Sequence, residues 1–257
     1  MMLLILNIAM LIFMLAPIVV VIWMSFTPGS VFALPFSEFS WRWYEASFAY
    51  PGFLNAFILS LQLGLVSALI SVVLSLLAAY ALLRGRRLRG LEAVEGLFLS
   101  PLIVPAVVFG IAMLQFMNLF GLYNTFMGLV LAHVVVITPF AIRTIQSSLS
   151  AVPIEVEWAA ENLGASRATV LWRIILPVCS RGILAAFLLA FLISFSEVTV
   201  TIFVAGPGYQ TLPVRIYNYL TDQVDPTVAA ISTMLIVLSV ALVLVLDRLG
   251  GLSNIRK

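Results

Sequence analysis

Charge is the scarcest property of this chain of 257 residues. Asp, Glu, Lys and Arg together make up 9% of it, whereas 63% of the residues are hydrophobic. Soluble domains carry about 25% charged residues, which they need to cover a surface that faces water. So little charge excludes an ordinary water-soluble domain and indicates that most of the surface faces lipid. We therefore expect membrane lipid around the chain and no nucleic acid as a partner.

Three chemically versatile residue types are nearly missing. The one cysteine, Cys179, rules out an internal disulfide, and we interpret it as a small buried apolar residue. The one lysine, Lys257, is the last residue, which excludes a phosphate-binding loop of the G-x-x-x-x-G-K-[ST] type. The one histidine, His133, has no Cys or His cluster beside it, so no metal site is expected. We interpret it as a packed, hydrogen-bonded helix residue rather than as a proton relay.

Long apolar segments are abundant instead. Six of them reach or approach the ~20 residues that a helix needs to cross a hydrocarbon core of ~30 Å, and helices satisfy their backbone polar groups internally. The segments comprise residues 3–24, 53–83, 93–117, 125–142, 182–205 and 226–246. The sequence therefore predicts an all-α, polytopic membrane protein with six transmembrane helices, in which residues 1–257 form a single transmembrane domain.

The basic residues are distributed unevenly between the connecting segments. Eleven of the 13 Lys and Arg residues fall on one side of the predicted bilayer, and only Arg42 and Arg215 fall on the other. The positive-inside rule places the eleven, and both termini, in the cytoplasm. Because the first apolar run exceeds the ~7–15 residues of a signal peptide and follows no basic region, we interpret it as a retained span.

The longest internal connection, residues 144–181, has the pattern of a helix, a turn and a second helix. Pro153 suits a first helical turn, Gly164 offers a corner, Ser166 is a cap for the second helix, and Pro177 is expected to close that helix. Apolar residues recur at helical spacing in both halves: Val152, Val156, Ala159, Ala160 and Leu163, then Ala168, Leu171, Trp172 and Ile175. Two interpretations fit: interfacial helices that pack on the bundle, or a docking surface for a cytoplasmic partner.

The same connection resembles the signature of ABC-importer permease subunits, in which Glu-Ala-Ala is followed by three residues, Gly, nine residues and Ile-x-Leu-Pro. The residues that match at these spacings are Ala159, Ala160, Gly164, Ile174, Leu176 and Pro177. Trp158 stands at the first position, and Glu157 lies one residue earlier. The resemblance implies that this segment couples to an ATPase subunit, with Glu157 as the candidate for the family glutamate. A shift of one residue, however, turns a helical side chain by about 100°.

The resemblance implies a type I ABC importer permease fold in the bacterial inner membrane. It implies a chain that is not itself catalytic and holds no cofactor, since partner ATPase subunits bind ATP and Mg²⁺. The implied partners are a homologous permease subunit in a heterodimer, two ATPase subunits and a periplasmic substrate-binding protein.

One acidic residue, Glu197, falls inside the predicted fifth span. An ionisable group in a membrane segment is costly and typically faces a cavity or a partner. We predict that Glu197 lines the translocation path together with Ser194 and Ser196. The alternatives are a buried acid paired with another subunit or kept protonated, and hydroxyls that bond their own helix.

The third span carries Pro101, Pro105 and Gly110. The two prolines are expected to break or kink the helix, and the glycine permits close packing. A kinked span is a candidate gate, although a static kink fits the pattern as well.

Two stretches, SEVTVTIFVAGPG and TLPVRIYNYL, resemble the second permease subunit of spermidine/putrescine-type importers. That group often has an acidic pair where this chain has Ser196 and Glu197, so a polyamine is favoured but an opine, an organophosphonate or an amino-acid derivative stays open. A secondary transporter that works without ATP is the rival class. Such a carrier more often shows internal repeats or several charges within the membrane, and this sequence shows neither. A membrane enzyme would need a nucleophile and base, which the sequence does not offer.

Overall fold

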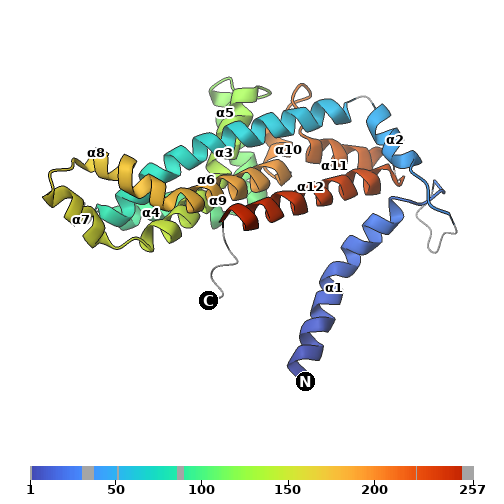
Figure 1. Ribbon diagram of the computed structural model, residues 1–257. Coiled ribbons are helices and arrows are strands. Elements are labelled where there is room, and N and C mark those ends of the chain that lie inside the picture. Colours follow the sequence, from blue (N-terminus) through green and yellow to red (C-terminus); the bar gives the residue numbers. More distant parts are fainter. Residues whose placement is uncertain (1, 31–37, 51, 86–89, 224, 251–257) are drawn as a thin grey trace.

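The computed structural model describes residues 2–30, 38–50, 52–85, 90–223 and 225–250, and every regular element within these ranges is helical. The helices form an elongated bundle, with α7 and α8 at one end and α2 and α11 at the other (Figure 1). In chain order the elements are α1 (Met2–Met24), α2 (Arg42–Ala49), α3 (Phe53–Arg84), α4 (Leu91–Leu99), η1 (Ser100–Leu102), α5 (Ala106–Leu119), α6 (Phe126–Ser150), α7 (Ile154–Asn162), α8 (Arg167–Val170), η2 (Leu171–Ile175), α9 (Leu176–Ser196), α10 (Thr201–Val204), α11 (Leu212–Asp222) and α12 (Thr227–Gly250). The predicted all-α class is confirmed.

The centre of the bundle is formed by α3, α6 and α9, which run side by side (Figure 1). Small residues permit their close approach, since a Cβ added to Gly64 of α3 would lie 2.9 Å from the ring of Phe191 on α9. A buried hydroxyl pair also links α3 to α6, with Ser71 Oγ 3.1 Å from Thr138 Oγ1. The buried apolar residues of this core are Ala68, Val72, Ala79, Ile137, Ala141, Ile145, Ala186, Ala190, Phe191 and Phe195.

Within the described residues, five helices are long and apolar enough to cross a membrane, and a bent pair makes a sixth span if its two parts are counted together. The pair consists of Leu91–Leu102 and Ala106–Leu119, which meet at 102°. Pro101 lies in the last turn before the bend, and Pro105 directly precedes α5. Proline has no backbone N–H to donate, and its ring clashes with the preceding turn of a continuous helix. The span predicted over residues 93–117 is therefore broken at the prolines that were expected to break it.

Two helices have limits that differ from the predicted spans. α6 continues to Ser150, beyond the predicted end at 142, and α9 ends at Ser196 rather than at 205. Pro177 does not close the second helix of the connection, because the helix is continuous over Arg167–Ser196. A π-helical turn, Leu171–Ile175, directly precedes this part of the helix. We attribute the tolerance of the proline to this wider turn, which relieves the clash of its ring with the turn before it.

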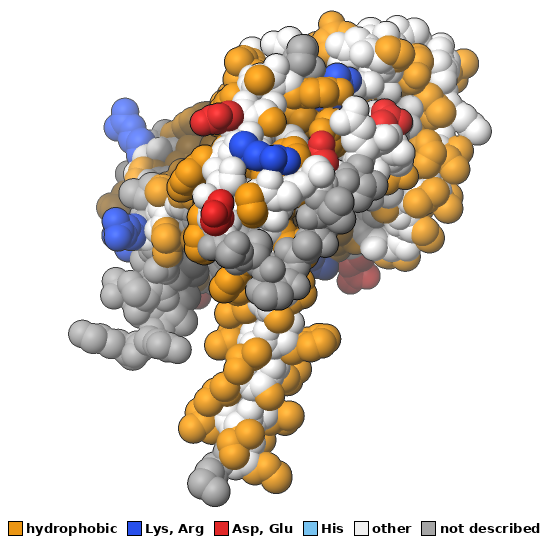
Figure 2. Space-filling model, turned by 90° about the vertical axis from the view of Figure 1, so that its right-hand side faces the viewer, with side chains coloured by type: hydrophobic (Ala, Val, Ile, Leu, Met, Phe, Trp, Pro, Cys, Tyr) orange, Lys and Arg blue, Asp and Glu red, His pale blue; other side chains and the backbone are white. Residues whose placement is uncertain are grey.

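α1 projects from the body of the bundle, and none of its 23 residues is buried (Figure 1). Figure 2, which views the molecule from the end that carries α2 and α11, shows hydrophobic side chains along the whole of this projecting helix. Such a surface suits a helix surrounded by lipid. The two basic residues that the sequence assigns to the external side, Arg42 and Arg215, belong to α2 and α11 at this same end.

Candidate functional site

The corner between α7 and α8 is formed by residues whose conformations suit their types. Pro153 precedes α7, and Gly164 follows it with a φ of +89°, which residues with a side chain rarely adopt. Ser166 caps α8, since its Oγ accepts the N–H of Thr169 at 3.2 Å. The segment is thus a helix, a turn and a helix, while its contact with an ATPase subunit stays a prediction.

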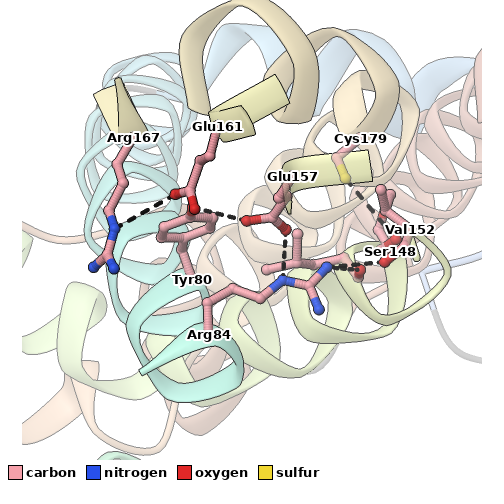
Figure 3. Close-up of polar contacts among 9 residues, drawn as sticks. Tyr80, Arg84, Ser148, Val152, Glu157, Glu161, Arg167 and Cys179 are labelled. Carbon is pink, nitrogen blue, oxygen red and sulfur yellow. Dashed lines mark hydrogen bonds and ion pairs between the residues drawn. The ribbon is translucent and has the colours of Figure 1, made fainter. Parts of the chain in front are cut away.

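One of the three acids of α7, Glu157, points into the protein. Glu157 is 4% exposed, and its Oε1 lies 2.7 Å from Nε of Arg84 at the end of α3. The hydroxyl of Tyr80, one turn earlier on α3, donates to Glu157 Oε2 at 2.9 Å (Figure 3). Both oxygens of the carboxylate therefore contact side chains of α3, and an ion pair and a hydrogen bond hold α7 against that helix.

Arg84 also holds the end of α6. Its Nη2 donates to the backbone carbonyls of Leu149 at 3.3 Å and Val152 at 2.9 Å (Figure 3). The last carbonyls of a helix have no partner within the helix and carry partial negative charge, so a guanidinium is well suited to them. Arg84 thus connects the ends of α3 and α6 with α7, and we call Tyr80, Arg84 and Glu157 the Arg84 cluster.

An apolar cluster supports these polar contacts. Its buried members come from α6, the residues after it, and the helix Arg167–Ser196. Tyr80, Leu83 and Ala160 pack against them from α3 and α7, so both α7 and α8 rest on the bundle. As expected, Cys179 is a buried apolar residue here. The buried residues are Leu149, Val152, Val170, Ile175 and Cys179.

The outer surface of the corner exposes large apolar side chains among charged ones such as Glu161 and Arg167. Trp158, Leu163 and Trp172 are 49%, 90% and 67% exposed, and Val156 is 40% exposed rather than packed on the bundle. The inward face of α7 is turned by about one residue, or roughly 100°, from the expected apolar stripe, because Glu157 occupies the inner position. The predicted coupling residues are distributed across this corner, with Ala159, Gly164 and Pro177 exposed and Ala160, Ile174 and Leu176 half-buried.

A cavity of about 210 Å³ opens beside the Arg84 cluster. Arg84, Glu157 and Trp158 are among the residues that line it. Across the corner, Nε of Arg167 lies 3.5 Å from Oε1 of Glu161, in an ion pair that water can reach. Within the part of the chain that the structure describes, no group of three or more His, Cys, Asp and Glu residues could hold a metal ion.

His133 of α6 is a packed, hydrogen-bonded residue, as predicted. It is 1% exposed, with Nδ1 2.7 Å from Ser194 Oγ and Nε2 3.0 Å from Thr201 Oγ1. Both ring nitrogens are therefore used to join α6 to α9 and α10. Ser194, one of the predicted path residues, faces this histidine and is buried.

Glu197 stands just beyond the end of α9 rather than inside a helix. Its carboxylate accepts the N–H of Val200 at 2.7 Å, which offers the backbone an alternative to continuing the helix. Ser196 is exposed, and its hydroxyl donates to the carbonyl of Leu192 in its own helix at 2.8 Å. Gly110 allows the close packing expected of it, since a Cβ there would lie 2.5 Å from the ring of Phe203. The path role of Glu197, Ser194 and Ser196 and the gating role of the prolines stay predictions.

Sequence patterns did not identify Tyr80 and Arg84 as site residues. One signal was available: the two residues are four apart near the end of an apolar helix, and this spacing places both on the same face. The partner of that face lies 73 residues further along the chain, and only the fold brings the two together.

Comparisons with known proteins agree with one another. Residues 71–254 match the family described as binding-protein-dependent transport system inner membrane component. The chain is 36% identical over 227 residues to the spermidine/putrescine transport system permease protein PotC of Haemophilus influenzae, covering 88% of each chain. It is 29% identical over 230 residues to the putrescine transport system permease protein PotI of Escherichia coli K12, covering 87% of this chain and 82% of the other.

Solved structures share the fold at low sequence identity. A chain of a bacterial ABC transporter involved in the import of the acidic polysaccharide alginate is 18% identical and superposes with a TM-score of 0.71, covering 95% of this chain and 93% of that one. The overall arrangement of the helices is therefore shared with a transport protein of known structure.

Proposed function

We propose that this chain, which belongs to the family of binding-protein-dependent transport system inner membrane components and is the permease subunit of an ABC importer, carries a polyamine such as spermidine or putrescine. The observation that supports this solute is the 36% identity to a spermidine/putrescine permease over 88% of both chains. Relatives of this kind are transport permeases and are not themselves catalytic, so the energy for transport comes from other subunits.

Loss of this chain is expected to remove most uptake of radiolabelled spermidine or putrescine by its host. The measurement is the initial rate of uptake in cells with and without the gene, and the control is its return on a plasmid. Unlabelled opine or organophosphonate should not compete with the labelled polyamine. If polyamine uptake is unchanged while uptake of another solute is lost, the chain remains an importer permease but the proposed solute is wrong.

The proposed assembly contains a homologous permease subunit, two ATPase subunits and a periplasmic substrate-binding protein. In this arrangement ATP and Mg²⁺ are bound by the ATPase subunits, and each permease forms half of the pathway. The corner of α7 and α8 is the proposed contact with an ATPase subunit, because exposed apolar side chains gather there on the end of the molecule. Purification of the tagged chain in mild detergent tests this assembly, since an ATPase subunit should be retained with it.

The proposed topology places both termini and the α7–α8 corner in the cytoplasm. Cysteine introduced at exposed Ala151, in a Cys179→Ala background, is expected to react with a membrane-impermeant maleimide only after the membrane is permeabilised. Cysteine at exposed Thr221, in α11, is expected to react with intact spheroplasts. The opposite labelling pattern would contradict this orientation.

A further inference from the structure

The most informative departure of this chain from the permease signature lies at the start of the Glu-Ala-Ala element. The position of the signature glutamate holds Trp158, whose side chain is about half exposed on the outer surface of the corner. The acid has moved to the preceding residue, and the Glu157 side chain is only 6% exposed. To contact a partner, Glu157 would have to leave Arg84 and uncover itself. In this chain the acid of the signature therefore acts within the subunit.

The polar contacts of the Arg84 cluster hold α7 in one position relative to α3. The Arg84 side chain is 14% exposed, and its Nε lies 2.7 Å from Glu157 Oε1 in an ion pair that is not aligned as a hydrogen bond. Tyr80 adds a hydrogen bond to the other carboxylate oxygen, and Arg84 Nη2 donates to one carbonyl in the last turn of α6 and one just after it. Apolar contacts permit sliding, whereas these contacts fix the position of α7 along α3.

α3 is suited to carry a displacement through the membrane. It is one continuous helix of 32 residues, with Tyr80 and Arg84 in its last turns. Near its other end, Ser60 Oγ accepts the backbone N–H of Leu212 at the start of α11, at 2.8 Å. A movement of the cytoplasmic end of α3 therefore reaches α11 at the opposite end of the molecule through a rigid element and a hydrogen bond.

We propose that Arg84 and Glu157, assisted by Tyr80, are positioning residues that transmit displacement of the coupling helix α7 to the membrane-spanning helix α3. This inference rests on the proposed docking of an ATPase subunit onto α7 and α8. The ATPase meets the exposed outer surface of the corner, which carries Trp158, Leu163 and Trp172, and the Arg84 cluster on the inner surface converts its movement into movement of α3. The chain thus separates docking from transmission on two faces of one short helix.

The test compares three variants in proteoliposomes that hold the complete importer with its binding protein. Arg84→Met and Glu157→Leu each leave one buried charge without its partner, so both are expected to lower the thermal stability of the complex. The double variant Arg84→Met with Glu157→Leu leaves no unpaired charge, so its stability should recover in part, although the hydrogen bonds of Arg84 to two carbonyls and of Tyr80 to Glu157 stay lost. Its transport of solute per ATP hydrolysed should nevertheless stay roughly tenfold below that of the unmodified importer, within the usual range of coupling free energies between sites. Glu92→Gln, at an exposed acid on α4, is the matched control and should transport normally.

The outcomes distinguish transmission from simple stabilisation. A double variant that regains both stability and normal transport per ATP would show that the pair is only structural and would overturn the inference. Single variants that transport like Glu92→Gln would overturn it as well. If the unmodified chain retains no ATPase subunit, the proposed docking fails and the inference fails with it, whereas normal retention with an unaffected double variant overturns the transmission alone.

Discussion

Replacement of Gly164 by proline is expected to abolish solute uptake while leaving the chain inserted in the membrane. Gly164 has a φ of +89°, and proline fixes φ near −65°, so the corner between α7 and α8 cannot keep its shape. The residue is exposed, and a Cβ there would meet nothing within 4 Å, so the spans themselves are not disturbed. The measurements are uptake in cells, the amount of chain in the membrane fraction, and solute-stimulated ATPase activity of the purified complex.

Two alanine variants show whether the loss of uptake comes from the left-handed backbone at Gly164 or from replacing a glycine as such. Gly164→Ala places a side chain in the left-handed region at a cost of about 1–2 kcal/mol, so we expect partial rather than complete loss of uptake. Gly96→Ala adds a side chain at another open position, in α4, where φ is not positive, and it should transport normally. Normal solute-stimulated ATPase activity in the proline variant would contradict a coupling role for this corner.

The sequence predicted those features that depend on local chemistry. Apolar length identified the spans, because lipid requires about 20 apolar residues per helix wherever the helix lies in the bundle. Gly164 and Ser166 marked the corner, because a left-handed residue and a helix cap are requirements of the local backbone. Pro101 and Pro105 marked the break in the third span for the same reason.

Helix limits were predicted less well, because hydropathy reports only the part of a helix that lies in lipid. α6 continues to Ser150 although its last residues are polar, since Gln146 and Leu149 are buried against neighbouring elements. Pro177 does not end its helix, because a π-helical turn precedes α9. Both helix limits depend on tertiary packing or on the local backbone, so composition and hydropathy do not predict them.

The Arg84 cluster could not be predicted because it depends on side-chain direction. Amphipathic spacing put Val156 and Leu163 on one apolar face and left open whether that face meets the bundle or a partner, whereas the ion pair with Arg84 turns Glu157 inward. A buried, paired carboxylate and an exposed tryptophan oppose the ordinary rule that apolar residues face the core. The exception lies at the proposed coupling site, which is where local rules and function are expected to disagree.

At the break between α9 and α10, Glu197 could serve the fold or the solute, because its carboxylate both stabilises the backbone and carries a charge. Glu197 Oε1 accepts the N–H of Val200, and the oxygen of a glutamine amide could accept this N–H equally well. Glu197→Gln therefore removes the charge and keeps the cap, whereas Glu197→Ala removes both. If the charge attracts a cationic solute in the pathway, Glu197→Gln should lower spermidine uptake by roughly tenfold or more, equivalent to about 1.4 kcal/mol.

The same comparison identifies a purely structural role. Glu45→Gln removes an exposed acid from α2, outside the spans, and should leave uptake unchanged, so any loss in Glu197→Gln cannot come from net charge alone. Uptake measured over a range of spermidine concentrations should show the loss mainly at low concentration, where attraction of the cation limits entry. Normal uptake by Glu197→Gln together with lost uptake by Glu197→Ala would assign Glu197 to the cap and remove it from the translocation path. The carboxylate at this helix break would then serve the fold of the fifth span, and recognition of the solute would have to lie elsewhere in the importer.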